Sequence, residues 1–431
     1  SIGTSRGCEM VGTGIGLGLS GFRVNPPGVL ATLDLNFASS LSLTSTSGIT
    51  PSFSRASTGT YFNSAGVLTS AAINGPRFDH VYNGSSWVSK GLLVEEQRTN
   101  VALQSNNLNT SPWTQSNNTA TEAAATSPDG TSNASGVVPN TTNAAHYTYQ
   151  LVTTSAISYA ISFYAKKNGY NFVQLSTGTT TDYVNFNLNT GSVGNVSGGI
   201  YSSAKIESVG NSWYRCSVNM AASAGSYDHG ITVINADTAS RRPAFAGDGA
   251  SGILLYGFQM EAGSFSTSHI PTTTAAVTRS ADVCQITGGD FSGFWNEPAG
   301  ALVAEGDTPA SGTKSLVSAD NATANESTIL RTLATDPLFI VTDGGVAQAS
   351  IDAGTVASGT AFKLAAAYTV NDFAISKDGA AVVTDSSGTI PTPTQLNIGA
   401  DVAGNYVCGH ISRLRYYPTR LTNAKLQELS T

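Results

Sequence analysis

Charged residues are scarce in this chain of 431 residues. Asp, Glu, Lys and Arg make up 11% of it, whereas a typical globular protein has about 25%. The formal net charge is −7, and the basic residues form no cluster. Because nucleic-acid backbones are bound by concentrated Lys and Arg, we expect no nucleic-acid partner.

Long hydrophobic runs and closely spaced cysteines are also missing. No segment has 18 consecutive apolar residues, so we expect no membrane insertion. The cysteines Cys8, Cys216, Cys284 and Cys408 are too far apart for a metal motif or a dense disulfide framework. The first ten residues show no charged segment followed by an apolar core, so we expect no secretory signal. These absences favour folding in a reducing cytoplasm.

Motifs of catalysis do not occur either. The five histidines include no HExxH pair, and no GxSxG nucleophile elbow is found. Glycoside cleavage needs two carboxyl groups about 5–10 Å apart, and the sequence does not pair candidates such as Asp182, Asp228 and Asp248. We therefore expect a protein that is not an enzyme and has no cofactor.

Glycine is abundant, with 45 residues, and short segments alternate apolar with polar residues. Several short strands without helical patterns between them are typical of a sandwich or jelly roll. We therefore predict an all-β fold of tandem β-sandwich (jelly-roll) domains. The central strands are expected at 147–152, 159–166, 172–176, 183–188, 212–220, 230–234 and 252–260.

Composition changes divide the chain into four predicted parts. They are an N-terminal arm (1–30), a small β-region (31–104), a jelly roll with its linker (105–283) and a second sandwich (284–431). The last part contains a hairpin at 372–385 with an Asp378-Gly379 turn of type I′. It ends in a short helix for which Thr422 is the N-cap and Leu421 and Leu426 form a hydrophobic staple.

The N-terminal arm alternates glycine with Ile and Leu. A phosphate-binding GxGxxG loop needs a following helix, whereas this segment is closed by Pro26-Pro27. Such a strip has little apolar surface nearby to bury it, so we expect the arm to attach to a partner or a sister subunit. The attachment candidates are Gly12, Gly14, Ile15, Gly16, Leu17 and Gly18.

Strand alternation predicts a polar and aromatic face in the jelly roll. Sugars stack their C–H faces on aromatic rings and need polar partners for their hydroxyls. If the strands share one sheet, the outward residues form a glycan-binding face; the alternatives are an ordinary sheet surface or a subunit contact. Trp87 and Trp113, near turns, are interpreted as loop anchors, with a ligand platform as the alternative. The candidates for glycan binding are Tyr164, Lys166, Phe172, Gln174, Tyr183, Asn185, Trp213 and Arg215.

Two segments carry a resemblance to known families. Residues 396–429, LNIGADVAGNYVCGHISRLRYYPTRLTNAKLQEL, resemble the end of a laminin-G/concanavalin-A-like sandwich. The stretches SPDGTSNA (127–134), VGNSWYRCSV (209–218) and YGFQMEAGSFSTSHIPT (256–272) resemble carbohydrate-binding modules of the jelly-roll type. Together with residues 53–100, this pattern is similar to fibre and minor structural proteins of bacteriophage virions.

The resemblance implies a virion protein, made in the host bacterial cytoplasm, that contacts the host surface as a tail fibre, spike or head fibre. Its expected partners are other virion proteins, through the arm, and a host surface glycan bound multivalently; a homo-oligomer, most often a trimer, is usual for such fibres. The resemblance also makes Glu261 a candidate ligand of a structural Ca²⁺. A purely structural decoration or tail-assembly protein and, third, a polysaccharide depolymerase remain as alternatives.

Overall fold

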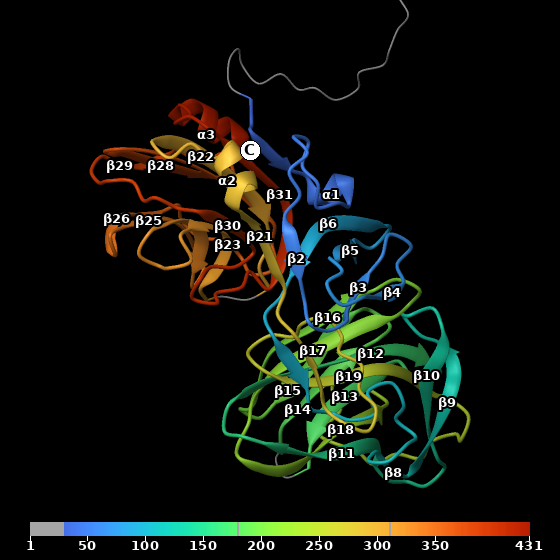
Figure 1. Ribbon diagram of the computed structural model, residues 1–431. Coiled ribbons are helices and arrows are strands. Elements are labelled where there is room, and N and C mark those ends of the chain that lie inside the picture. The colour runs from blue at the N-terminus through green and yellow to red at the C-terminus, as the bar shows by residue number, and fades with distance from the viewer. Residues whose placement is uncertain (1–29, 179–180, 310–311) are drawn as a thin grey trace, which may run out of the picture. The chain divides into compact units, whose positions relative to one another are not determined.

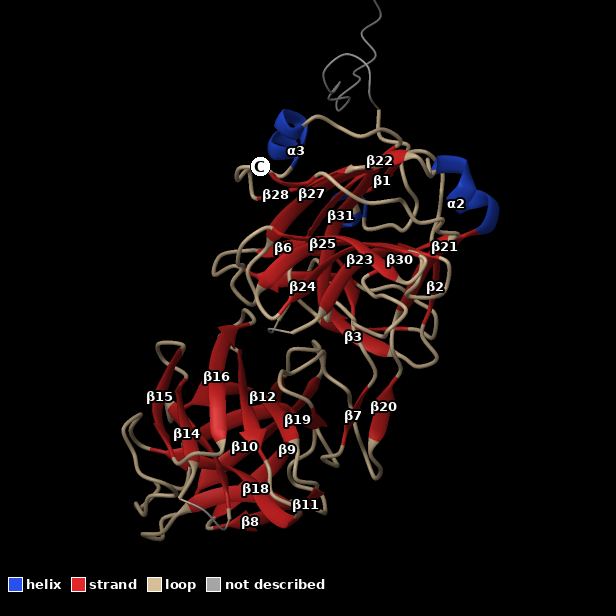
Figure 2. Cartoon of the chain, turned by 90° about the vertical axis from the view of Figure 1, so that its left-hand side faces the viewer, coloured by secondary structure: helices blue, strands red, loops and turns tan. Residues whose placement is uncertain are grey.

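Antiparallel sheets account for nearly all regular structure in the computed structural model (Figure 1). The structure describes residues 30–178, 181–309 and 312–431, so the attachment candidates of the arm lie outside the described residues. Residues 31–431 form one compact unit. The sheets pack in two pairs, each pair around its own apolar core, which confirms the all-β, tandem-sandwich prediction (Figure 2).

The first sandwich contains the predicted jelly roll. Sheet I has the order β16 (Tyr201–Ser208), β17 (Tyr214–Ala221), β12 (Ser158–Asn168), β19 (Gly252–Ala262), β10 (Ser132–Pro139), β9 (Asn118–Thr126). Strand β7 (Arg98–Asn100) also pairs with β19, and β20 (Val277–Arg279) pairs with β7. Sheet II has the order β15 (Ser192–Ser197), β14 (Tyr183–Asn187), β13 (Phe172–Thr177), β18 (Gly225–Ile234), β11 (His146–Thr154), β8 (Thr114–Ser116). Each of the seven strands expected in this region is present.

The second sandwich is built from both ends of the described chain. Sheet III has the order β29 (Val383–Asp385), β28 (Asp372–Lys377), β27 (Phe362–Thr369), β22 (Ala299–Gly306), β31 (Gly409–Tyr417), β6 (Trp87–Val94), β5 (Phe78–Tyr82), and β1 (Leu33–Leu35) pairs with β31. Sheet IV has the order β2 (Ser52–Ser54), β21 (Val283–Thr287), β30 (Gln395–Ile398), β23 (Lys314–Asp320), β24 (Ser327–Leu333), β25 (Asp336–Asp343), β26 (Val346–Asp352).

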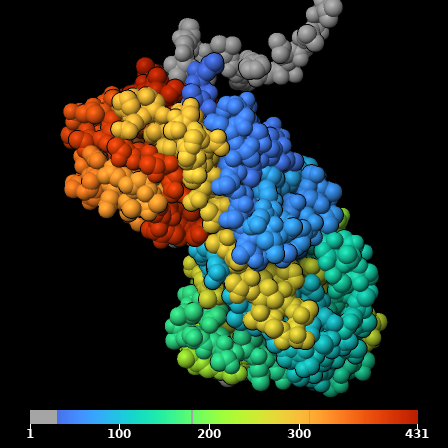
Figure 3. All heavy atoms as spheres, viewed as in Figure 1, coloured from blue at the N-terminus to red at the C-terminus, as the bar shows by residue number. Residues whose placement is uncertain are grey.

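Residues 31–104 are therefore not a separate small β-region. Strands β1, β5 and β6 extend sheet III, and β2 extends sheet IV. The apolar faces of these strands are too small to form a core alone, and Leu33, Leu35, Leu92 and Val94 instead fill the core of the second sandwich. A two-stranded hairpin of β3 (Gly59–Phe62) and β4 (Leu68–Ala71) stays outside both sandwiches. In Figure 3 the blue N-terminal residues adjoin the yellow residues near 280, in agreement with the pairing of β2 and β21.

Local signals in the second sandwich act as predicted. Both Asp378 and Gly379 have positive φ, as a type I′ turn requires, and β28 pairs with β29. Three short helices occur in the described ranges: α1 (Phe37–Ser40), α2 (Gly288–Phe294) and α3 (Asn423–Leu429). Helix α3 is capped by Thr422, whose side chain accepts a hydrogen bond from the Lys425 amide. None of the helices in the described part is long and apolar enough to span a membrane.

Candidate functional site

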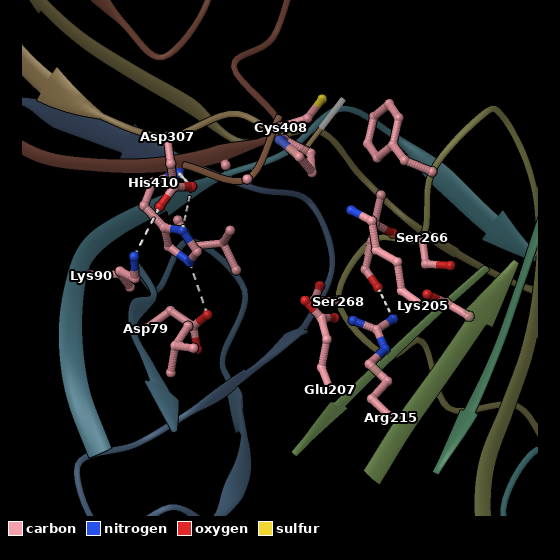
Figure 4. Close-up of a pocket in the computed structure, with 18 of the residues that line it drawn as sticks. Asp79, Lys90, Lys205, Glu207, Arg215, Ser266, Ser268, Asp307, Cys408 and His410 are labelled. Carbon is pink, nitrogen blue, oxygen red and sulfur yellow. Dashed lines mark hydrogen bonds and ion pairs between the residues drawn. The ribbon is translucent and has the colours of Figure 1, made fainter. Parts of the chain in front are cut away.

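A cleft of about 730 Å³ lies where the outer face of β16 and β17 meets β5, β6 and the start of β31 (Figure 4). Loop 264–268, which follows β19, closes one side of it. Its size is within the range of pockets that hold small-molecule ligands. The aromatic lining residues are Phe62, Tyr82, Trp87 and Phe265, and the charged ones are Asp79, Lys90, Glu95, Lys205, Glu207, Arg215, Asp307 and His410.

One wall of the cleft holds a carboxylate–imidazole–carboxylate triad. His410, on β31, places Nε2 3.0 Å from Asp79 Oδ2 and Nδ1 2.9 Å from Asp307 Oδ1. Burial alone lowers the pKa of His410, but the two carboxylates outweigh it and raise the pKa to about 10. Lys90 Nζ adds a second cation, 3.5 Å from Asp307 Oδ2. The triad therefore carries a protonated imidazole at neutral pH and ties its two carboxylates to it.

The opposite wall is formed by alternating outward side chains of two paired strands. Glu207 on β16 is opposite Arg215 on β17, and Lys205 is opposite Ser217. Ser203 and Asn219 continue the same face of the cleft. This wall presents hydroxyl, amide, ammonium and guanidinium groups, which together donate and accept hydrogen bonds.

Aromatic side chains gather at the end of the cleft next to the β3–β4 hairpin. The ring of Trp87 lies 4.8 Å from that of Phe62 and 5.7 Å from that of Tyr82, measured between centroids. Gly66 makes room for the indole, because a Cβ at this position would lie 2.0 Å from Trp87 Nε1. Trp87 stays half-buried and lines the cleft. This position is compatible with the ligand platform that the sequence offers as the alternative to a loop anchor.

A buried network of charged side chains holds loop 264–268 in place. Glu95 accepts hydrogen bonds from the Ser268 amide (2.7 Å) and hydroxyl (2.6 Å). The same carboxylate forms ion pairs with Arg77 (2.7 Å) and Arg279 (2.9 Å). Burial raises the pKa of Glu95, but the two arginines and Ser268 hold it well below its ordinary range. The loop is thus fixed by charge-assisted hydrogen bonds.

The structure corrects the predicted glycan-binding face, because its strands do not share one sheet. Strands β12 and β17 belong to sheet I, whereas β13 and β14 belong to sheet II. The predicted alternation itself is right: Phe163, Cys216 and Val173 point into the core. The eight candidates are therefore divided between two opposite faces of the sandwich.

On sheet I only Arg215 among the candidates lines the cleft. Tyr164 and Trp213 face away from the sandwich core, but a second apolar cluster with Leu68 of the β3–β4 hairpin buries both. Lys166 is half-buried and lies outside the cleft lining. A hairpin from a distant part of the sequence thus contributes to the burial of two of the four candidates on sheet I.

On sheet II the chain covers the candidates with its own loop. Asn185 donates to the carbonyls of Asp237 (2.9 Å) and Ala239 (2.8 Å), and Gln174 donates to that of Ser240 (3.0 Å). Both amides are fully buried. Tyr183 is also buried, and Phe172 is half-buried. Gln174, Tyr183 and Asn185 are therefore not available to a glycan in this structure, and Phe172 lies outside the cleft lining.

The surroundings of Glu261 do not fit a calcium ion. Its carboxylate is fully buried and accepts hydrogen bonds from Gln259 Nε2 and from the amide and hydroxyl of Thr267, at 2.6–2.8 Å. Ca²⁺ takes six to eight oxygen ligands, and here N–H and O–H donors occupy both carboxylate oxygens. The described residues also contain no group of three or more His, Cys, Asp or Glu side chains placed to hold a metal.

Several residues of the cleft were not predicted from the sequence as site residues. Lys205 and Glu207 lie on a strand that the alternation did not reveal. Asp79, Asp307 and His410 are far apart in the sequence and meet only because β5, β31 and the end of β22 converge. The tight turn Asn83-Gly84 was the available signal, since it joins β5 and β6.

Comparisons with known proteins find distant structural likeness alone. No protein-family model matches the chain, and no curated protein matches it. The CBM40 of the Ruminococcus gnavus IT-sialidase, bound to α2,3-sialyllactose, is 15% identical, with a TM-score of 0.29 over 33% of this chain and 88% of that one.

Two further solved structures show the same level of likeness. Domain 4 of the arabinanase AbnA from Geobacillus stearothermophilus, in complex with arabinotriose, is 12% identical, with a TM-score of 0.29 over 38% of this chain and 82% of that one. Mouse laminin α1 domains LG4-5 are 10% identical, with a TM-score of 0.24 over 66% of this chain and 88% of that one.

Proposed function

We propose that this protein binds carbohydrate in the cleft between β5–β6 and β16–β17. The observation that carries the proposal is the indole of Trp87, half-buried at one end of the cleft beside the polar wall of β16 and β17. A sugar ring stacks its C–H face on such an indole, and its hydroxyls find partners in side chains such as Ser217 and Asn219. Gly66 leaves the space that the indole occupies, because a Cβ there would clash with it.

The finer proposal places this site on a bacteriophage virion, as part of a fibre or spike that contacts the host surface. It rests on the sequence resemblance of residues 53–100 and 127–272 to such proteins. A single weak sugar site, with a Kd near 1 mM, contributes roughly −4 kcal/mol. An oligomer that presents several such sites to one surface gains affinity through effective concentration. The proposed partners are therefore sister copies, other virion proteins and a host glycan.

The first test is binding of the purified protein to a glycan array and to intact host cells before and after periodate oxidation of their sugars. We expect binding that periodate removes and that Trp87→Ala weakens by at least about tenfold, since stacked aromatics dominate such contacts. Tyr149→Ala is the matched control, because Tyr149 is also a half-buried aromatic but does not line the cleft.

The outcomes separate the proposal from the other interpretations of the sequence. No binding to any glycan contradicts the proposal and favours a structural decoration or tail-assembly role. Release of reducing ends from host polysaccharide identifies a depolymerase instead. For the virion role, removal of residues 1–30 is expected to leave a folded protein that no longer joins the particle; normal incorporation contradicts attachment through this segment.

A further inference from the structure

Arg215 differs from most arginines of the described chain in having no anionic partner. Nine others lie within 4.0 Å of a carboxylate oxygen, which leaves only Arg215 and Arg241 without an ion pair in the described ranges. Arg241 donates to the carbonyl of Thr177, away from the cleft. Arg215 is thus the one described arginine that brings an uncompensated charge into the cleft.

The guanidinium of Arg215 is held in place by neutral acceptors. Its Nη2 donates to Ser162 Oγ at 3.1 Å and to the Thr267 carbonyl at 2.5 Å. Its Cζ lies 5.8 Å from the centroid of the Tyr164 ring. Nη1 has no partner among the described residues, and Figure 4 shows the guanidinium directed into the cleft. The group is therefore oriented before any ligand arrives, which reduces the entropy cost of binding.

The balance of charges around Arg215 specifies a ligand with one negative charge. Asp79 and Asp307 are balanced by the two cations His410 and Lys90. Glu95 is balanced by Arg77 and Arg279 from outside the cleft lining. Among the remaining charged residues of the cleft, Lys205 and Arg215 are cations and Glu207 is an anion, and none of the three is within ion-pair distance of another described residue. One positive charge is left over. A doubly charged phosphate next to Glu207 is less well compensated there than a carboxylate.

We propose that the cleft selects acidic saccharides, and that a sugar carboxylate binds between Nη1 of Arg215 and the ammonium of Lys205. This inference rests on the proposed carbohydrate binding and names its ligand class. Nη1 can donate a charge-assisted hydrogen bond to one carboxylate oxygen, and the Lys205 ammonium can pair with the other. A neighbouring sugar ring of the same saccharide then stacks on Trp87 at the end of the cleft next to the β3–β4 hairpin.

The test is an array on which each acidic oligosaccharide stands beside its carboxyl-reduced, neutral counterpart. Oligogalacturonates, hyaluronan fragments and chondroitin fragments serve as the acidic probes. We expect the full-length protein to bind acidic members and to lose at least about tenfold in affinity for their reduced partners, as for a lost charge-assisted hydrogen bond.

Variants of the same chain place the effect at the proposed residues. Arg215→Gln and Lys205→Gln are each expected to weaken acidic binding by about tenfold and to leave binding of the reduced partners unchanged. Lys205 is exposed and has no partner among the described residues, so we expect K205Q to fold. This variant therefore still tests the proposal if R215Q fails to fold. Glu207→Gln is expected to strengthen acidic binding. Lys167→Gln, which removes an exposed charge outside the cleft, is the control.

Two failures are distinguishable. If reduced and acidic partners bind equally, the carboxylate site is wrong and carbohydrate binding in the cleft stands. If no saccharide binds on this array or on the general glycan array, the proposed function is wrong and this inference is wrong with it.

Discussion

Arg77 and Asp282 form a fully buried ion pair, with 2.5 Å between Arg77 Nη2 and Asp282 Oδ2, although 205 residues separate them. Asp282 also pairs with Arg55, at 3.0 Å. Asp282 lies in the segment between β20 and β21, whereas Arg55 directly follows β2 and Arg77 directly precedes β5. The pair therefore anchors the crossing segment against β2 and β5.

Replacing Asp282 with Asn tests this anchor. The variant leaves Arg55 and Arg77 buried with one carboxylate fewer, so we expect the free energy of unfolding to fall by about 3–5 kcal/mol. Urea unfolding followed by tryptophan fluorescence measures it. The control is Glu297→Gln at an exposed position, expected within about 0.5 kcal/mol of the parent. A loss of the same small size for D282N contradicts the role of the pair.

The triad of His410 predicts a pH dependence of stability. Its folded-state pKa is raised to about 10, whereas an unfolded histidine titrates near 6.5. The stabilisation is therefore fully present below about pH 6.5 and is lost as pH rises toward 10, with a slope of at most about 1.4 kcal/mol per pH unit.

The measurement compares the unfolding free energies of the parent and His410→Gln at pH 6, 8 and 9.5. Groups that titrate in both proteins cancel in the difference. We expect the advantage of the parent to shrink across this series. A difference that stays constant with pH means that His410 is neutral in the folded protein, and the triad is then wrong.

A substitution of Asn185 tests whether the covered face of sheet II contributes to stability and not to glycan binding. Asn185→Ala removes two buried hydrogen bonds to the loop at 237–239, so we expect a loss of about 1–3 kcal/mol in stability. Glycan binding should not change, because this residue lies outside the cleft. Thermal unfolding and the glycan array are measured on the same preparation. Weaker glycan binding by the folded variant would show that this face of sheet II takes part in glycan binding.

Thr422 tests the cap of helix α3. Thr422→Ala removes the acceptor for the Lys425 amide, 3.3 Å away, and we expect a loss of about 1 kcal/mol. Thr422→Ser keeps the hydroxyl and is expected to retain most of the stability. Equal unfolding free energies for the two variants would show that the hydroxyl does not cap the helix.

Strands and turns were predictable because their signals are local. The alternation around Phe163 and Cys216 gave the right inward faces, and Asp378-Gly379 gave the right turn. The partner of each strand was not predictable, because the order of strands in a sheet depends on contacts between segments that are far apart in the sequence. The predicted glycan-binding face failed at this step: Tyr164 points outward as expected and is then buried under Leu68.

The amino-acid sequence by itself determined the all-β class, seven strands of the first sandwich and the capped C-terminal helix, because period-two alternation, turn pairs and a capping hydroxyl act over a few residues. Only the tertiary structure decided that β1, β2, β5 and β6 complete the second sandwich. It alone also brought His410 to Asp79, which lies 331 residues away, and left Arg215 without a carboxylate partner in the described chain. Such contacts are set by packing between distant segments, and no local pattern encodes them.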